Sequence, residues 1–401
     1  MFPITIISFK VIGNFILLLL SIFGIYRIIT ERINPFKLKP LKYITYLSLS
    51  YFLVMLLSII LSSGFGEELR HIFRKLHFLF LPALAVAFYG LKMDFDKLIK
   101  LLKFYVLTLS IFLFGLSLYD NFVIHSHIPF EVGHLLKPPI WINSNVFGDI
   151  FVVLVFISIS KIFYEERGDF ILSVISFFMG SMGLFLIQSR GSWIAFLLLM
   201  ILFTIFVFKK YFVDRIIRRR ISVLLLLILS VALLYMPYLS HTVDKTLNNI
   251  EEVNVQSQAY SSGGVRLQMW QASLDAFRSM PWHGYGYRLA NERVAEFSKY
   301  NKENIASFTH LHNEYITNIM SAGFIGLFLM LAMIFWPMLL FYRARKKDHL
   351  YKYAIAGILI TSAYTLFGLF HIALGEEHLN AVYIFFMAYL IPIVYEYQEQ
   401  P

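Results

Sequence analysis

Repeated apolar runs of about twenty residues constrain this chain more than any other feature of its sequence. Each run is long enough to cross about 30 Å of hydrocarbon as an α-helix, in which the backbone polar groups are hydrogen-bonded within the segment. The runs are continuous and lack the alternation of membrane β-barrel strands. Only 15% of the 401 residues are charged, too few to cover a soluble protein of this size. We therefore predict an all-α polytopic membrane protein.

We predict eleven membrane spans, and the positive residues between them indicate the orientation of the chain. The spans cover residues 5–26, 43–62, 74–91, 101–122, 146–163, 169–188, 191–208, 220–238, 316–342, 352–372 and 380–396. The connections richest in Lys and Arg all fall on one side under this count, at residues 27–42, 92–103, 209–220 and 343–352. The positive-inside rule makes that side cytoplasmic and places the N-terminus outside.

One long polar segment on the outer side divides the chain. This outer loop (239–315), which we expect to contain helices, separates the N-terminal transmembrane helices (1–238) from the C-terminal ones (316–401). The net charge of +10 comes from short connections rather than from a nucleic-acid motif, so we expect no nucleic-acid partner. Cysteine is absent, which excludes disulfides and thiolate chemistry. The start MFPITIISFK lacks the pattern of a cleaved secretory signal, so we expect the first run to remain as an anchor.

Arg190 stands between two apolar runs in GLFLIQSRGSWIAFLLLM, residues 183–200. The predicted topology puts it on the outer side, where membrane orientation gives no reason for an arginine. Arg190 is therefore a candidate cation for an anionic ligand. The alternative is a structural arginine whose guanidinium snorkels toward water.

Arg266 is a second candidate, at the start of VRLQMWQASLDAFRSM in the outer loop. We expect a break over residues 261–264 (SSGG) and a helix stop at Pro281, which would put Arg266 in the first turn of a helix. Free backbone N–H groups and the helix dipole favour an anion there, and the alternative is an arginine on a solvated face. Three large residues recur at helical spacing and predict the buried face of this helix: Trp270, Leu274 and Phe277.

Two histidines, His310 and His312, precede the ninth span in HLHNE. They are two positions apart, so on a helix they would face different ways, which disfavours joint metal binding. No H-x-x-x-H or H-E-x-x-H pattern is present, and we expect no metal or other cofactor. A histidine at this boundary serves either as an interfacial hydrogen-bonding residue or as a general base, because its unperturbed pKa is about 6.5.

Two further polar clusters lie on the outer side. The first is basic and stands at the outer end of the third span: Arg70, His71, Arg74, Lys75 and His77. Three of its members share a helical face through i, i+4 and i+7 spacing, which suits an anionic ligand or lipid head groups. The second comprises His371 and the turn of Glu376, Glu377 and His378, which we interpret as solvated.

Three stretches with these residues occur in a particular order: QSRGSW after a central span, GVRLQMWQASLDAF in the outer loop, and HLHNEYITNIMSAGFIGL entering the next span. On this topology the ordered set resembles the O-antigen ligase and O-antigen polymerase superfamily of bacterial inner-membrane proteins. WINSNVFG, at residues 141–148, resembles another polar patch that precedes a span in these proteins. Ligases of this group generally have twelve spans with the N-terminus inside, so the chain departs from the pattern at its N-terminal end.

The resemblance implies an inverting, metal-independent glycosyltransferase of the GT-C type, with a site at the periplasmic face of the bacterial inner membrane. It implies a glycan donor on undecaprenyl pyrophosphate and, for a ligase, a sugar hydroxyl of lipid A–core as acceptor. The motif arginines correspond to Arg190 and Arg266 as pyrophosphate ligands, and the motif histidine corresponds to His312 beside the acceptor hydroxyl. Weaker candidates for contact with pyrophosphate or acceptor are Arg70, Arg74, Lys75, His310, Asn313, Glu314 and Asp149.

An O-antigen ligase is the leading interpretation, and two kinds of alternative stand beside it. An O-antigen polymerase or a protein O-oligosaccharyltransferase of the same superfamily would differ in the acceptor. A transporter or flippase would carry ionisable residues in mid-membrane or Gly/Pro-broken helices in two repeats. The ionisable clusters of this chain gather at the outer boundary instead.

Overall fold

A computed structural model describes residues 10–62, 65–91, 94–124, 143–162, 165–211, 262–287 and 289–396, together with parts of 215–236. Every regular element in these residues is a helix, which confirms the prediction of an all-α polytopic membrane protein. Seven of the described helices are long and apolar enough to cross a membrane, judged by length and composition, and three shorter apolar helices accompany them.

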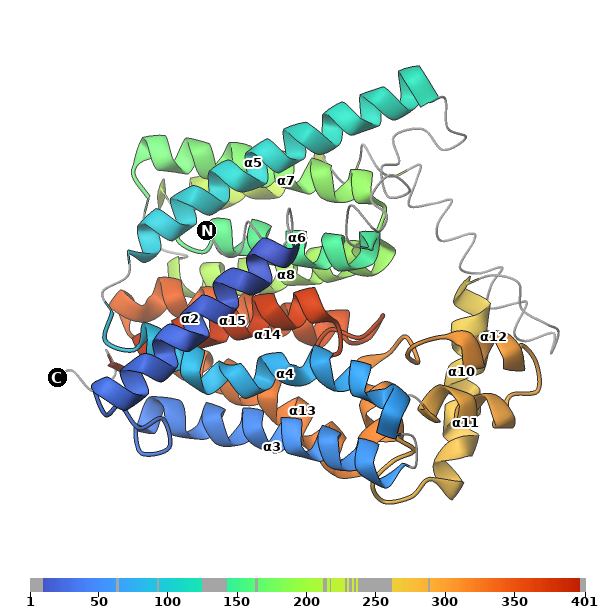
Figure 1. The fold of residues 1–401 in the computed structure, drawn as a ribbon. Coiled ribbons are helices and arrows are strands. Elements are labelled where there is room, and N and C mark those ends of the chain that lie inside the picture. Colours follow the sequence, from blue (N-terminus) through green and yellow to red (C-terminus); the bar gives the residue numbers. More distant parts are fainter. Residues whose placement is uncertain are drawn as a thin grey trace.

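The apolar helices lie side by side in one bundle (Figure 1). They are α2 (Lys10–Thr30), α3 (Lys39–Leu61), α4 (Phe65–Phe88), α5 (Phe95–Tyr119, continued by a π-turn at Asp120–Ile124), α6 (Ser144–Ser158), α7 (Arg167–Ile187), α8 (Arg190–Tyr211), α13 (Glu314–Ala344), α14 (Tyr351–Phe367, after a 3₁₀ turn at Asp348–Leu350) and α15 (Glu377–Glu396). Each predicted span except 220–238 has its helix, and 220–238 is described only in part. The largest differences lie at helix ends: α4 begins at Phe65 rather than residue 74, α5 begins at Phe95 rather than residue 101, α6 ends at Ser158 rather than residue 163, and α14 ends at Phe367 rather than residue 372.

The centre of the bundle is α6. Its residues 146–158 are all buried, and α5, α7, α8, α14 and α15 surround it. Because α6 is apolar on nearly all sides, it can have helices packed around it without burying unpaired polar groups. The one ionisable side chain of α6, Asp149, is only 1% exposed.

Basic connections meet at one end of the bundle. Arg27 in the last turn of α2 donates to carbonyl oxygens at the end of α4. Lys161 and Lys352 both pair with Asp96 at the start of α5, at 3.5 and 2.8 Å. These contacts join connections that the sequence predicts to share the cytoplasmic side.

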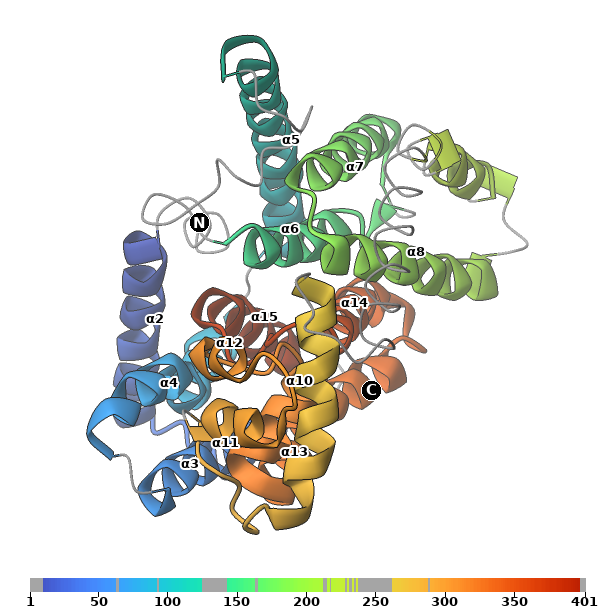
Figure 2. The ribbon, with the colours of Figure 1, turned by 90° about the vertical axis from the view of Figure 1, so that its right-hand side faces the viewer.

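The outer segment lies at the opposite end of the bundle (Figure 1). It contains α10 (Ser262–Ala276), a 3₁₀ turn (Phe277–Ser279), α11 (Leu289–Phe297) and α12 (Lys302–Ser307). Seen from this end, α10 crosses the bundle, with one end near α6 and α8 and the other over α13 (Figure 2). The segment has a small apolar core of its own.

The start of α10 differs from the prediction. Residues 262–264 are helical, so the break expected over SSGG is wrong for them, and Arg266 lies in the second turn rather than the first. A helical glycine costs only about 1 kcal/mol relative to alanine, and packing readily offsets that amount. The stop before Pro281 is confirmed, because α10 gives way to the 3₁₀ turn and then to extended backbone at Met280.

The predicted buried face of α10 is wrong at two of its three residues, because Trp270 packs partly buried against the core of the segment but Leu274 and Phe277 do not. Leu274 is 73% exposed and Phe277 is 37% exposed. The buried residues are smaller and lie on another stripe: Val265, Met269, Ala272 and Ala276. Short side chains on α11, such as Ala290 and Val294, complete the same cluster. Helical spacing alone is compatible with either stripe of residues, and the packing of α10 on its neighbours determines which stripe is buried.

Near its outer end, α13 is broken. The backbone at Gly323 has φ +65° and ψ −165°, outside the helical region. The carbonyl oxygens of residues 320 and 321 accept hydrogen bonds from the N–H groups of Tyr285 (2.7 Å) and Gly286 (3.0 Å). A Cβ on Gly323 would lie 2.0 Å from the carbonyl oxygen of Trp282. Close backbone contact therefore fixes the loop between α10 and α11 on the bundle.

Candidate active site

The corner between α7 and α8 presents Arg190. Gln188 ends α7 in the left-handed conformation (φ +55°), and Arg190 opens α8 with an exposed side chain. Between them, the buried Ser189 donates its Oγ hydrogen to Asn145 Oδ1 (3.1 Å) and lies 2.7 Å from Ser192 Oγ. These bonds tie the corner to α6 and so fix the position from which Arg190 extends.

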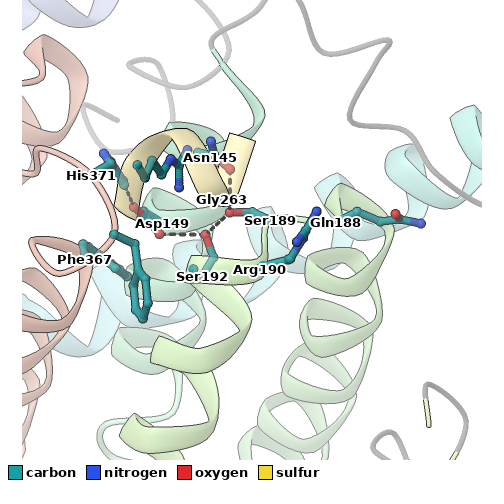
Figure 3. Close-up of a pocket in the computed structure, with 12 residues that line it drawn as sticks. Asn145, Asp149, Gln188, Ser189, Arg190, Ser192, Gly263, Phe367 and His371 are labelled. Atoms are coloured by element: carbon teal, nitrogen blue, oxygen red, sulfur yellow. Dashed lines mark hydrogen bonds and ion pairs between the residues drawn. The ribbon is translucent and has the colours of Figure 1, made fainter. Parts of the chain in front are cut away.

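Arg190 and Arg266 line the same cavity, of about 240 Å³. Arg266 comes from α10. The remaining walls come from α6, the α7–α8 corner, the end of α14 and the α14–α15 connection (Figure 3). The structure thus brings together two arginines that are far apart in the sequence and that sequence analysis named separately.

The two guanidinium groups influence each other. Burial and then repulsion by Arg190 lower the pKa of Arg266. Within the described part of the chain, no carboxylate forms an ion pair with either arginine. An anion in the cavity would remove their repulsion and accept charge-assisted hydrogen bonds from both. The cavity is therefore suited to an anionic group.

His312 lies in the loop before α13 and has a left-handed backbone (φ +50°). This loop is not helical, so the expectation that His310 and His312 face different ways is wrong: their ring centroids are 4.4 Å apart. Both histidines line a second cavity, of about 350 Å³. Asn145 and His371 belong to the walls of both cavities, which are therefore neighbours.

The environment of His312 keeps its ring neutral. Burial first, and then the charges of Arg266 and His371, lower its pKa to about 4. A neutral imidazole at pH 7 can accept a hydrogen bond from a hydroxyl group. The effect of Arg266 on this pKa also indicates that the two motif residues lie close together.

Two hydrogen bonds hold α10 against the parts of the site that follow it. Trp270 Nε1 donates to the carbonyl of Leu311 (2.9 Å), directly before His312. Tyr285 donates its hydroxyl hydrogen to the carbonyl of Ala276 (2.8 Å) at the end of α10. The position of α10, and with it Arg266, is thus coupled to the His312 loop and to the loop fixed on α13.

A buried polar chain runs from the α7–α8 corner to His371. Ser192 Oγ donates to Asp149 Oδ1 (2.6 Å), and His371 Nε2 is hydrogen-bonded to Asp149 Oδ2 (Figure 3). Burial by itself would lower the pKa of His371, but attraction to Asp149, with smaller effects of Glu376 and Glu314, raises it on balance. Burying an ionisable side chain such as Asp149 on an apolar helix costs free energy, and such residues in membrane proteins commonly belong to functional sites.

The interpretation of residues 371–378 as a solvated turn is wrong. His371 and His378 are 9% and 6% exposed. Glu376 accepts the backbone N–H groups of His378 (2.7 Å) and Leu379 (3.1 Å) and so caps the first turn of α15. The connection folds inward because its polar groups find partners there.

Two of the weaker candidates have structural partners. Lys75 is buried, and its Nζ donates to the carbonyl of Leu374 (2.8 Å) and the hydroxyl of Tyr51 (3.1 Å). Asn313 caps α13 by accepting the N–H of Ile316 (3.0 Å). Neither residue lines either of the two cavities.

Other predicted contacts are placed only in part. Arg70 and Arg74 belong to the first turns of α4, but their side chains lie outside the described residues. Among the described residues, no group of three or more His, Asp and Glu side chains has the geometry to hold a metal ion.

Sequence analysis missed Ser189, Ser192 and the hydrogen bond between Asp149 and His371. The available signal was the single carboxylate in the apolar run NVFGDIFVV.

A comparison with protein families finds a match over the part of the chain that carries the two arginines and His312. Residues 175–331, less than half of the chain, match the protein-family model described as O-antigen ligase. The matched segment contains Arg190, Arg266 and His312, whereas Asp149 precedes it and His371 follows it. A comparison with curated proteins gives no match.

Proposed function

From the premise that this chain is a member of the O-antigen ligase superfamily, we propose that it transfers a polysaccharide from undecaprenyl pyrophosphate to a sugar hydroxyl of lipid A–core. The transfer serves lipopolysaccharide biosynthesis, inverts the anomeric centre and uses no metal. The observation that carries this proposal is the meeting of Arg190 and Arg266 at one cavity, with His312 close to Arg266.

The chemistry needs negative charge to be neutralised where pyrophosphate leaves. As the acceptor oxygen attacks C1 of the donor sugar, the bond from C1 to the pyrophosphate oxygen breaks and charge builds on that oxygen. Two preorganised guanidinium groups stabilise such charge, and each offers paired donors to phosphate oxygens. His312, which is neutral at pH 7, hydrogen-bonds the acceptor hydroxyl in the neighbouring cavity.

The position of the site in the bundle supports a periplasmic active site in the inner membrane. The cavities lie at the end of the bundle opposite to Arg27, Lys161 and Lys352. The positive-inside rule assigns that basic end to the cytoplasm. The lipid A–core acceptor and the lipid-linked donor then reach the site from the surrounding membrane.

The test is transfer of glycan from undecaprenyl pyrophosphate to lipid A–core by the purified protein, with EDTA present. Losing one preorganised charge or hydrogen-bonding partner costs about 10²–10³ in rate, so we expect losses of at least that size for Arg190→Ala, Arg266→Ala and His312→Ala. Arg278→Ala is a matched control, because Arg278 is exposed on the same outer segment and lines neither cavity. An equal loss at Arg278 would mean that folding, not chemistry, explains the series.

The products of the same assay separate the alternatives. Glycan that lengthens on its lipid carrier indicates a polymerase, and glycan on a protein acceptor indicates an oligosaccharyltransferase. Loss of the ligase product on addition of EDTA would refute the metal-independent mechanism. A well-folded protein with none of these activities would favour the transporter or flippase.

A further inference from the structure

His371 stands at the boundary between the two cavities. It lines the cavity of Arg190 and Arg266 and also the cavity of His310 and His312. Its ring comes from the α14–α15 connection, outside the segment that matches the family model. If the donor pyrophosphate occupies the first cavity and the acceptor the second, a group at this boundary faces the reacting atoms of both.

A buried carboxylate orients the ring of His371. Nε2 is hydrogen-bonded to Asp149, which leaves Nδ1 as the nitrogen that can accept a proton. Asp149 is itself held by Ser192, and Ser192 lies beside Ser189, which bonds to Asn145. A base oriented by a fixed carboxylate is the arrangement that activates hydroxyl groups in hydrolytic triads.

His312 has a different environment. Its ring packs against Phe308 and His310, with centroids at 4.9 and 4.4 Å, and among the described residues no carboxylate pairs with it. The neighbouring charge of Arg266 opposes a proton on the ring. His312 can therefore hold a hydroxyl group but is a poor place for the proton that this group loses.

We propose that His371, oriented by Asp149, accepts the proton of the acceptor hydroxyl, while His312 positions that hydroxyl. This inference rests on the function proposed above. In the step, the acceptor oxygen forms a bond to C1 of the donor sugar, and the C1–oxygen bond to pyrophosphate breaks with its electron pair. The hydroxyl proton moves to Nδ1 of His371, which later releases it to water.

The pH dependence of the purified wild-type protein distinguishes the two histidines. Charged and titratable groups surround His371 on both sides. They are Asp149 on α6, Glu314 on α13, Glu376 and Glu377 at the start of α15, His310 and His312 in the loop before α13, and Arg190 and Arg266 across the first cavity. On balance these groups raise the pKa of His371 above its ordinary value of 6.5. We therefore expect the acidic limb of the pH profile, where kcat/KM for transfer falls as the base becomes protonated, to lie above the ordinary histidine value of 6.5. With His312 as the base, activity would persist to about pH 4.

Variants provide a second, independent readout. General bases contribute about 10²–10⁴ to rate, so His371→Gln should lower kcat by that factor with little change in the KM for donor. Asp149→Asn removes the charge that raises the His371 pKa, so the acidic limb should move to lower pH while kcat falls. His283→Gln, in the outer loop away from both cavities, is the control.

Three results would overturn the inference. They are a wild-type acidic limb near pH 4, a His371→Gln variant within about threefold of wild type, and an Asp149→Asn variant with an unmoved limb. The wild-type profile decides the matter even if a variant fails to fold. Absence of transfer by the wild-type protein would refute the proposed function itself, which is a different result from normal transfer without His371.

Discussion

Replacing Gly323 by alanine tests how the outer segment is held over the bundle. Gly323 breaks α13 at φ +65° and ψ −165°, a region that essentially only glycine occupies. An added Cβ would lie 2.0 Å from the carbonyl oxygen of Trp282, which belongs to backbone and cannot rotate away. The variant must therefore either keep a strained backbone or release the loop that contains Trp282.

Both responses are costly. A residue forced into a glycine region costs about 1–3 kcal/mol, and overpacking adds about 1–3 kcal/mol. Release of the loop instead loses the hydrogen bonds of Tyr285 and Gly286 to residues 320 and 321, each worth about 1 kcal/mol, together with the contacts around them. We expect the free energy of unfolding to fall by roughly 2–6 kcal/mol on the first route and α10 to be freed on the second.

Thermal unfolding and transfer activity measure the two responses together. A released loop moves the end of α10, and a displacement of about 1 Å at a catalytic group can cost about 10² in rate. Gly115→Ala is the matched control, because it lies in α5 and its Cβ would meet no atom within 4 Å. If Gly323→Ala has the same thermal unfolding midpoint and the same transfer activity as this control, backbone contact at Gly323 does not position the outer segment.

Three further changes have defined outcomes. Trp270→Phe loses one hydrogen bond to the loop before His312, so the free energy of unfolding should fall by about 1 kcal/mol and transfer should slow. An unchanged transfer rate would show that this hydrogen bond does not contribute to activity. The pKa of His312 is about 4 when folded and about 6.5 when unfolded, so the unfolded chain binds more protons between these values and stability falls as pH drops from 6.5 to 4. In His312→Gln, unlike the control His349→Gln, this pH dependence should weaken by up to about 1.4 kcal/mol per pH unit in unfolding experiments. Lys103→Met leaves Glu165 buried without its cation and should lower the free energy of unfolding by about 3–5 kcal/mol. The double variant Lys103→Met with Glu165→Met should lose less, and an equal loss in the two proteins would contradict the pairing.

The positions of the spans follow from local properties of the sequence. A continuous apolar run in a membrane must satisfy its backbone within itself, so run length predicts a helix without knowledge of its neighbours. The runs predicted at 169–188 and 191–208 accordingly appear as α7 and α8, with the polar corner at Ser189 between them. The basic connections likewise indicate the shared end of the bundle that the structure shows.

The details that build the outer segment do not follow from local properties. SSGG reads as a break, but the small cost of glycine in a helix is offset by packing, so residues 262–264 join α10. The break in α13 at Gly323 lies in an ordinary apolar run, and it exists because the loop at Tyr285 supplies hydrogen-bond donors from elsewhere. In both cases, a partner distant in the chain decides the local conformation.

The sequence by itself determined the class of protein, the helices and the side of the membrane on which Arg190, Arg266 and His312 are expected to lie. These properties depend on hydropathy and charge, which each segment carries alone. Only the tertiary structure decided that the two arginines share a cavity and that Asp149 bonds to His371, 222 positions away. Such contacts depend on how helices pack across the bundle, and that packing is set by all of their surfaces together.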